Sequence, residues 1–199
     1  MKKHLVWLRA DLRSIDNTAL TAACADPEAD IAAVYFITPE QWQLHHVAGC
    51  RIDFELRTLR QLSKQLAALN IPLLIVETAN FQSQVQALLD LCQQHLFSAV
   101  YFNKQYEINE LARDESVHQL LAQQQIDTFD FDDQCLVAPY KVLTGEGRFY
   151  SVFTPFKKTW LQCIYHQGVN IQSAPDKRPS LWLTPSDVPK RVTGFESHI

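Results

Sequence analysis

The chain has 199 residues, of which 47% are hydrophobic and 20% are charged, with a formal net charge of −4. This length is enough for one well-packed core with some chain to spare. Because domains that grip nucleic acid are usually basic, the small negative charge argues against a main DNA-contacting surface in this chain.

The five cysteines are scattered along the chain and form no CxxC pair. This spacing argues against a zinc site and against a disulfide framework, and it favours a reducing compartment. No hydrophobic run approaches the length of a membrane span, so we expect no membrane partner. Together these features predict a soluble cytoplasmic protein without a metal site.

Five short hydrophobic runs alternate with helical patterns in the first 131 residues. The runs cover residues 4–8, 31–37, 71–77, 96–102 and 126–131. Helical patterns cover residues 18–24, 51–69 and about 85–92, and another begins near residue 109. Strands that alternate with helices are typical of a parallel sheet covered on both faces. The pattern predicts an α/β fold with a five-stranded parallel, doubly wound, Rossmann-like sheet. Crossovers on both faces require a chain reversal beside the first strand, which gives the order 3-2-1-4-5.

Local signals refine these helices. Asn17 precedes the first helical pattern and is expected to cap it. Asp53 and Arg57 lie one turn apart in the helix at 51–69 and are expected to pair. Thr154 and Pro155 indicate an N-cap followed by the first residue of a further helix.

The character of the chain changes after residue 131, where turn-forming residues mix with aromatics. From Ala174 onward, frequent prolines forbid long helices, and Trp182 is expected to pack against another part of the protein. We therefore divide the chain into an α/β domain at 1–133 and an extended interdomain linker at 134–199. Three basic pairs, at 157–158, 177–178 and 190–191, are interpreted as solvated surface.

Charged residues of alternating sign follow the first hydrophobic run, namely Arg9, Asp11, Arg13 and Asp16. One interpretation is a cluster of ion pairs beside the cap at Asn17. The other is a docking surface for a further domain.

Polar residues also gather where the fourth run ends, at Asn103, Tyr106, Glu107, Asn109 and Glu110. Ligands bind at the carboxyl ends of the strands in sheets of this kind. No GxGxxG or GxxxxGK[ST] motif accompanies them, and five glycines in the whole chain leave little material for a phosphate loop. These residues could thus form a ligand site, or Asn109 could cap the next helix with Glu110 opposing its dipole.

Four motifs occur in order between about residues 4 and 165: WLRADLRSIDNTAL, TPEQW, QYEINELARD and FYSVFTPFKKTW. With these motifs the chain resembles the amino-terminal half of bacterial class I cyclobutane pyrimidine dimer photolyases that carry a folate antenna. The resemblance implies an α/β domain followed by an all-helical domain. That helical domain holds reduced flavin adenine dinucleotide (FAD) and the flipped dimer of UV-damaged DNA, and it repairs the dimer by light-driven electron transfer.

The resemblance also implies an antenna pigment, 5,10-methenyltetrahydrofolate, in a cleft between the two domains. Matching the motifs residue by residue assigns Asn109, Glu110 and His45 to this site. A pterin edge offers an amine and ring N–H donors, which suit a carboxylate, and Asn109 can both donate and accept. No catalytic residue is expected in this chain, which we expect to be inactive without the helical domain.

Two other functions fit the same residues: a cryptochrome that signals instead of repairing, and a stand-alone nucleotide-binding or interaction module. The pigment is also open, because some relatives use a deazaflavin or a flavin. Without its helical partner, the chain is expected to self-associate weakly through an apolar patch around Tyr150, Phe153 and Trp160.

Overall fold

The computed structural model describes residues 2–196. Its strands are β1 (Lys3–Leu8), β2 (Asp30–Ile37), β3 (Leu73–Glu77), β4 (Ala99–Asn103) and β5 (Asp127–Phe131). Its helices are α1 (Thr18–Ala23), α2 (Pro39–Leu44), α3 (Gly49–Ala68), α4 (Phe81–His95), α5 (Ile108–Gln123), the short 3-10 helix η1 (Pro139–Lys141) and α6 (Phe153–Gln167). Within these residues no helix is long and apolar enough to cross a membrane.

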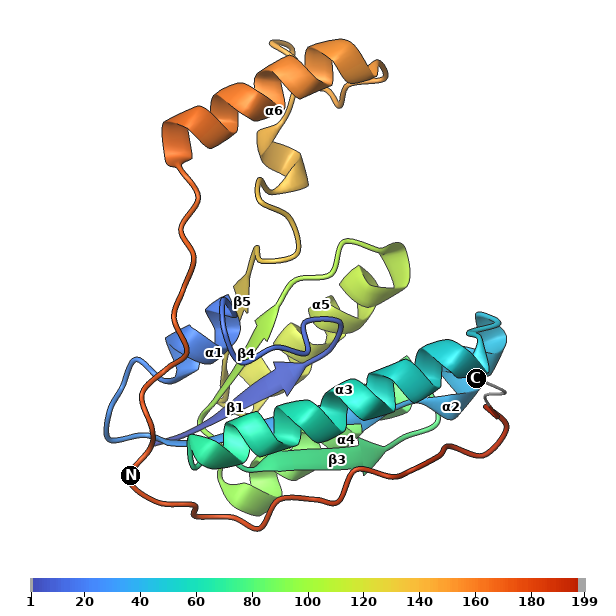
Figure 1. The fold of residues 1–199 in the computed structure, drawn as a ribbon, viewed down its shortest axis with the longest axis vertical. Coiled ribbons are helices and arrows are strands. Elements are labelled where there is room, and N and C mark those ends of the chain that lie inside the picture. The colour runs from blue at the N-terminus through green and yellow to red at the C-terminus, as the bar shows by residue number, and fades with distance from the viewer. Residues whose placement is uncertain (1, 197–199) are drawn as a thin grey trace.

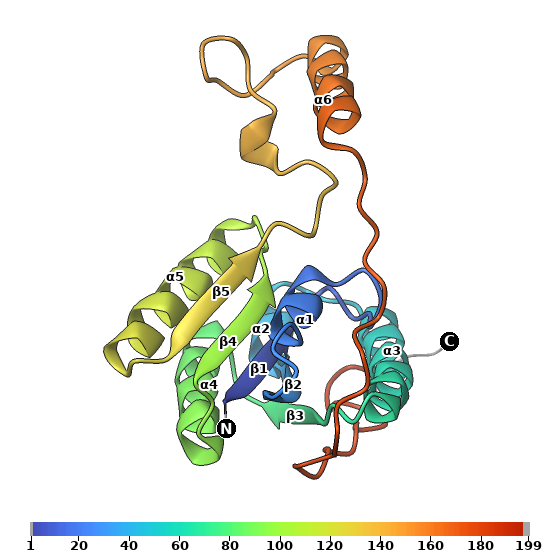
Figure 2. The same ribbon diagram turned by 90° about the vertical axis from the view of Figure 1, so that its left-hand side faces the viewer.

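The strands form one parallel sheet in the order β3-β2-β1-β4-β5, which confirms the predicted fold class and strand order. Helices α1 and α3 cover one face and α4 and α5 cover the other (Figures 1 and 2). Side chains of β1 alternate between the two cores, with Val6 in one and Trp7 in the other, and both are fully buried. This two-sided burial explains why the strands are almost continuously hydrophobic.

Several local predictions are confirmed. The Asn17 side chain caps α1 by accepting a hydrogen bond from the Leu20 N–H at 3.1 Å. In α3, Asp53 Oδ2 lies 3.0 Å from Arg57 Nη2. The α3 face that carries the predicted apolar repeat is buried against the sheet, as expected from a spacing of three and four residues.

One helix was not predicted from the sequence, and the start of another differs from the prediction. Helix α2 was not predicted, because its six residues carry no apolar repeat and none of them is buried. Helix α6 begins at Phe153 with Val152 as its N-cap, so the assignment of Thr154 as the cap is wrong. Pro155 still lies in the first turn, where the backbone N–H groups have no intrahelical acceptor and proline costs little.

Residues 134–171 form an excursion that carries η1 and α6 away from the sheet and then returns (Figures 1 and 2). No residue of α6 is buried. Residues 174–196, called here the strap, then run below the sheet and along β3 to finish beside α2 and α3 (Figure 1).

The strap is attached near its start by Arg178, which is 6% exposed. Its guanidinium group donates hydrogen bonds at 2.6–3.2 Å to four backbone carbonyl oxygens, those of Cys24, Asp26, Pro27 and Ala29. The interpretation of the pair at 177–178 as solvated surface is therefore wrong for Arg178 and holds for the exposed Lys177. A guanidinium suits this position because its several N–H donors point in fixed directions.

Further along the strap, Trp182 packs edge-on against Phe97, with ring centroids 5.7 Å apart, and its Nε1 donates to the Ile31 carbonyl at 3.0 Å. The prediction that Trp182 packs against another part of the protein is thus confirmed. The indole closes the end of the core between the sheet and α4.

Replacing Arg178 by lysine (Arg178→Lys) should lower the free energy of unfolding by about 3 kcal/mol, because one ammonium group cannot satisfy four carbonyls that face a guanidinium. Urea unfolding followed by circular dichroism measures the change. The matched control is Lys177→Gln, which alters an exposed neighbour and should change the unfolding free energy by less than about 0.5 kcal/mol. Equal effects in the two variants would contradict the assignment.

Candidate functional site

A hollow lies at the carboxyl ends of β1 and β2, bounded by α2, α3, α4 and α5. This inner hollow has a volume of about 410 Å³. Aromatic side chains line it (Tyr35, Trp42 and Phe81), together with carboxylates and amides (Glu55, Gln84, Glu107 and Glu110) and the guanidinium groups of Arg9, Arg51 and Arg113. The volume lies in the range of small-molecule sites, and the place in the fold is where such sheets bind ligands.

A second hollow, the outer groove, adjoins the first and has a volume of about 480 Å³. Leu44, Val85 and Asn109 contribute to its walls. The two hollows share four lining residues: Gln41, His45, Phe81 and Arg113. They therefore meet between α2 on one side and the start of α5 on the other.

The three residues assigned to the antenna site lie around this junction. Glu110 lines the inner hollow, Asn109 lines the outer groove and His45 lines both. Glu110 is partly exposed, whereas Asn109 and His45 are exposed. The fold thus brings together residues from α5 and from the end of α2 that are more than 60 positions apart in the chain.

The alternative role of Asn109 as a helix cap is wrong. Helix α5 begins at Ile108 and its N-cap is Glu107, which makes no side-chain capping bond. Asn109 and Glu110 both lie in the first turn, and the Glu110 carboxylate suits the positive end of the helix dipole there. Its position on the helix is thus compatible with both a structural and a ligand-binding role.

Two other polar residues of the same sequence cluster have structural roles. Asn103 is 4% exposed and its amide group donates to Asp11 Oδ2 at 2.6 Å and to Asn17 Oδ1 at 2.9 Å. The Tyr106 hydroxyl donates to Asp132 Oδ1 at 2.9 Å, and burial together with this bond raises the pKa of Tyr106. Neither residue lines the inner hollow or the outer groove.

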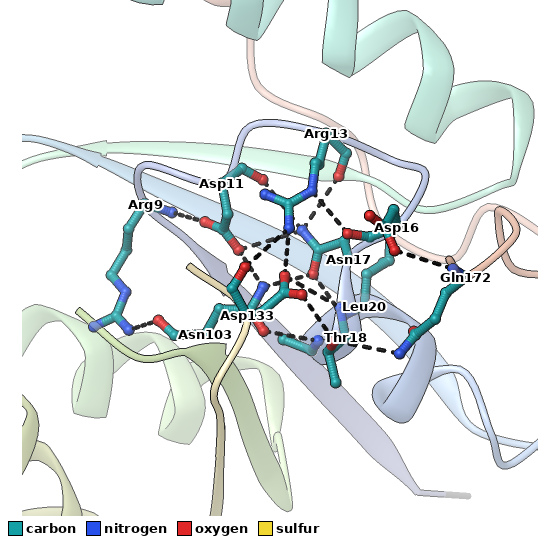
Figure 3. A network of polar contacts seen from close by, with 11 residues as sticks. Arg9, Asp11, Arg13, Asp16, Asn17, Thr18, Leu20, Asn103, Asp133 and Gln172 are labelled. Carbon is teal, nitrogen blue, oxygen red and sulfur yellow. Dashed lines mark hydrogen bonds and ion pairs between the residues drawn. The ribbon is translucent and has the colours of Figure 1, made fainter. Parts of the chain in front are cut away.

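The charged loop after β1 holds both ends of the excursion (Figure 3). On the outgoing side, Arg13 Nη2 lies 2.6 Å from Asp133 Oδ2, and the Thr18 hydroxyl donates to Asp133 Oδ1 at 2.9 Å. On the returning side, the Gln172 N–H donates to Asp16 Oδ1 at 3.0 Å, and its side-chain amide donates to Thr18 Oγ1 at 3.3 Å. The cap at Asn17 is confirmed, and both arginines of the loop form ion pairs, although with Asp114 and Asp133 and not with Asp11 or Asp16. Docking of a further domain stays a prediction.

Sequence reasoning missed a buried pair of arginines next to the inner hollow. Arg9 Nη1 lies 2.6 Å from Asp114 Oδ1, and Arg113 Nη2 lies 2.8 Å from the same oxygen. Both guanidinium carbons lie over the Trp7 ring, 4.7 and 4.6 Å from its centroid. Burial, with the nearby charge of Arg9, lowers the pKa of Arg113 to about 10. Because the two arginines share one carboxylate, this cluster keeps a net positive charge. Glu110 is one of the acidic groups whose charge partly offsets the lowering of the Arg113 pKa.

The inner hollow also contains a buried acceptor without a partner. Gln84 is 4% exposed, lines the hollow, and its Oε1 has no hydrogen-bond partner among residues 2–196. An unpaired buried oxygen is costly, so this atom would gain from a ligand that donates an N–H. In the same part of the chain, no group of three or more His, Cys, Asp or Glu side chains could hold a metal ion.

These features define a parallel α/β domain with an acceptor-rich hollow at the carboxyl ends of its strands. Residues 4–179 match the family described as DNA photolyase, and the chain belongs to this family. It is 43% identical over 192 residues to the deoxyribodipyrimidine photo-lyase of Vibrio cholerae, and the match covers 95% of the chain and 39% of that protein.

The deoxyribodipyrimidine photo-lyase of Escherichia coli is 37% identical over 186 residues, which cover 94% of this chain and 39% of that protein. The chain thus spans about 39% of the length of these curated relatives. Among solved structures, a Synechocystis cryptochrome matches with a TM-score of 0.76 at 22% identity, covering 94% of this chain and 40% of its own, which shows the shared fold.

Replacing Asp114 by asparagine (Asp114→Asn) should lower the free energy of unfolding by about 3–5 kcal/mol, because it leaves two buried guanidinium groups without their shared carboxylate. Guanidinium chloride unfolding measures the change. Glu115→Gln is the matched control, since Glu115 is the exposed neighbour on the same helix and should have an effect below about 0.5 kcal/mol. A small effect of Asp114→Asn would show that the pair is not a structural requirement.

Proposed function

We propose that this chain is the antenna-binding α/β domain of a deoxyribodipyrimidine photo-lyase, a light-driven enzyme that splits cyclobutane pyrimidine dimers in UV-damaged DNA. The names of its close relatives support the reaction. The observation that carries the antenna role is the position of Glu110, Asn109 and His45 around the junction of two adjoining hollows.

The residues around this junction fit a reduced folate such as 5,10-methenyltetrahydrofolate. The Glu110 carboxylate can accept two hydrogen bonds from the exocyclic amine and a ring N–H of the pterin. The unpaired Gln84 Oε1 offers a further acceptor, and the Phe81 and Trp42 rings offer faces for a flat heterocycle. Asn109 and His45 lie toward the outer groove, where the rest of the molecule would extend.

When bound, the folate supplies absorption of near-ultraviolet light and passes the excitation to FAD in the helical domain. The residues of this chain hold and orient the pigment, and they leave the chemistry of repair to the other domain. A deazaflavin or flavin antenna is the alternative for the inner hollow, which is the more aromatic of the two. The absorption spectrum of the full-length protein as purified distinguishes these pigments.

The proposal includes the division into an α/β domain at 1–133 and a connecting segment at 134–199. Asp133, the last residue of the first part, is held by Arg13 and Thr18. The exposed excursion beyond it offers a surface for the protein's own C-terminal helical domain. In space the division is less sharp, because the strap returns to the α/β domain.

A cryptochrome is the second candidate, because proteins of this fold include the Synechocystis cryptochrome as well as photolyases. The flavin and lesion pockets that separate the two activities lie, by family resemblance, in the helical domain. A repair assay on the full-length protein decides between them. Light-dependent splitting of thymine dimers supports the photo-lyase, and FAD binding without splitting supports the cryptochrome.

Replacing Glu110 by glutamine (Glu110→Gln) keeps the shape of the side chain but places an N–H donor opposite the donors of the pterin. Losing a charge-assisted hydrogen bond costs roughly 1.5–3 kcal/mol, so folate affinity should fall by about tenfold to a hundredfold or more. The folate absorption band of the purified full-length protein measures occupancy. Repair under light absorbed directly by FAD should continue.

The control is Glu115→Gln on the same helix, because Glu115 lines neither hollow. It should leave folate occupancy at the wild-type level. Unchanged occupancy in Glu110→Gln would refute the assignment of this carboxylate to the pigment.

The 199-residue chain purified by itself should fold, retain neither FAD nor folate, and show no repair. Under the proposal, the helical domain supplies the flavin pocket and the second wall of the antenna site, and half a site leaves one face of the ligand in water. Absorption spectroscopy and a dimer-splitting assay measure these outcomes. A stoichiometric chromophore on the isolated chain would contradict the account of a shared site.

Weak self-association of the isolated chain should involve the apolar patch around Tyr150, Phe153 and Trp160, since Phe153 is 71% exposed. Phe153→Ser should then lower the average mass in sedimentation equilibrium at high concentration. Phe54→Ser is the control, because Phe54 is an exposed phenylalanine on α3, away from the patch. Equal association of both variants and the wild type would exclude this surface.

A further inference from the structure

Two residues that line both hollows belong to α2 or follow it directly: Gln41 and the C-cap His45. Few contacts hold this helix in place. Helix α2 has six residues, none of them buried, and its N-cap Thr38 makes no side-chain capping bond. On its amino-terminal side, the N–H groups of Glu40 and Gln41 donate to the Ala79 carbonyl at 3.1 and 3.3 Å. A helix this short is unstable by itself, so tertiary contacts must hold Trp42 and the terminal His45 in place.

One such contact comes from the far end of the strap. The Phe195 ring meets the Trp42 ring edge-on, with centroids 5.6 Å apart and planes at 88°. Phe195 is 8% exposed and, with Val192, belongs to the core cluster beneath α3. The strap therefore supports α2 through the Trp42 side chain, in addition to the backbone contact at Ala79.

Two glycines make this approach possible. A Cβ atom on Gly49, the first residue of α3, would lie 2.4 Å from the carbonyl oxygen of Glu196. Gly194 has φ +84°, and a Cβ there would lie 3.2 Å from Gln43 Nε2. Since alanine is the better helix former, a glycine at position 49 is explained by the close passage of the strap.

The strap reaches α2 already ordered. After Arg178 and Trp182, the Ser186 N–H donates to the Leu73 carbonyl at 2.8 Å, and Arg60 Nη1 donates to the Pro189 carbonyl at 3.1 Å. Each attachment shortens the free segment that follows, so little conformational entropy remains to be lost when Phe195 packs.

We propose that Phe195 is a positioning residue for the antenna site: packed on Trp42, it holds α2 so that Trp42 lines the inner hollow and His45 lies where the two hollows meet. This inference rests on the proposed function. Without Phe195, α2 would populate displaced arrangements, and the apparent affinity for the pigment would fall with the fraction of molecules that keep α2 in place.

The first test is hydrogen–deuterium exchange in the full-length protein without folate. In Phe195→Ala, amides of residues 40–48 should exchange about tenfold faster than in the wild type, because an aromatic contact and its buried surface are lost. The matched control is Leu181→Ala, which truncates an exposed side chain of the strap and should leave the exchange of residues 40–48 unchanged. Unchanged exchange in Phe195→Ala would overturn the proposal.

The second test is titration of the same variants with 5,10-methenyltetrahydrofolate. Phe195→Ala should weaken binding by about tenfold, and Phe195→Tyr, which keeps the aromatic contact, should restore it. Gly49→Ala should also weaken binding by displacing Glu196, although alanine favours the helix. Stronger binding in Gly49→Ala, or wild-type affinity in Phe195→Ala despite faster exchange, would overturn the positioning role.

The two tests separate this inference from the proposed function. If the wild-type protein binds no folate, the proposed function fails, while the exchange experiment still decides whether Phe195 holds α2. If the wild type binds folate and loss of Phe195 changes neither exchange nor affinity, the proposed function stands and the positioning role is refuted.

Discussion

The arrangement of the site depends on one buried ionic contact at the carboxyl end of β1. Arg9 leaves the first strand with its guanidinium between the rings of Trp7 and Phe102, and it donates to the Asn103 carbonyl at the end of β4 and to Asp114 in α5. Removing these charges from water is costly. The contact is therefore favourable only when the ends of β1 and β4 and helix α5 are correctly placed relative to one another. The first turn of α5, with Asn109 and Glu110, is thereby oriented against the sheet.

The two walls of the site are held in physically different ways. On the α5 side, the charged groups are buried and stacked on aromatic rings, and Asp114 joins both arginines. On the α2 side, the backbone contact at Ala79 and the ring of Phe195 support a helix without buried residues of its own. If the hollows bind the proposed pigment, a firmly held wall facing a lightly held one would help the site to admit a bulky ligand.

The loop after β1 links this site to the rest of the protein. Through Asp16 and Thr18 it bonds to the returning end of the excursion, and through Arg13 to the outgoing end (Figure 3). The contacts that orient α6 relative to the sheet thus lie next to the end of β1, the same strand end from which Arg9 holds α5. If a helical domain docks on the excursion, its position relative to the proposed antenna site is fixed through this loop.

The sequence by itself determined the features that depend on neighbours in the chain: the strands and long helices, their parallel order, the cap at Asn17 and the pairing of Asp53 with Arg57. Periodicity and short-range spacing carry that information. The motifs also placed Asn109, Glu110 and His45 among the candidate residues. Only the tertiary structure decided which polar groups are buried and what they meet, because contacts such as Arg9 with Asp114, Arg178 with four carbonyls and Phe195 with Trp42 join segments 100 or more residues apart. No local pattern encodes such pairs, so α2 and its support by the strap could be seen only in the folded chain.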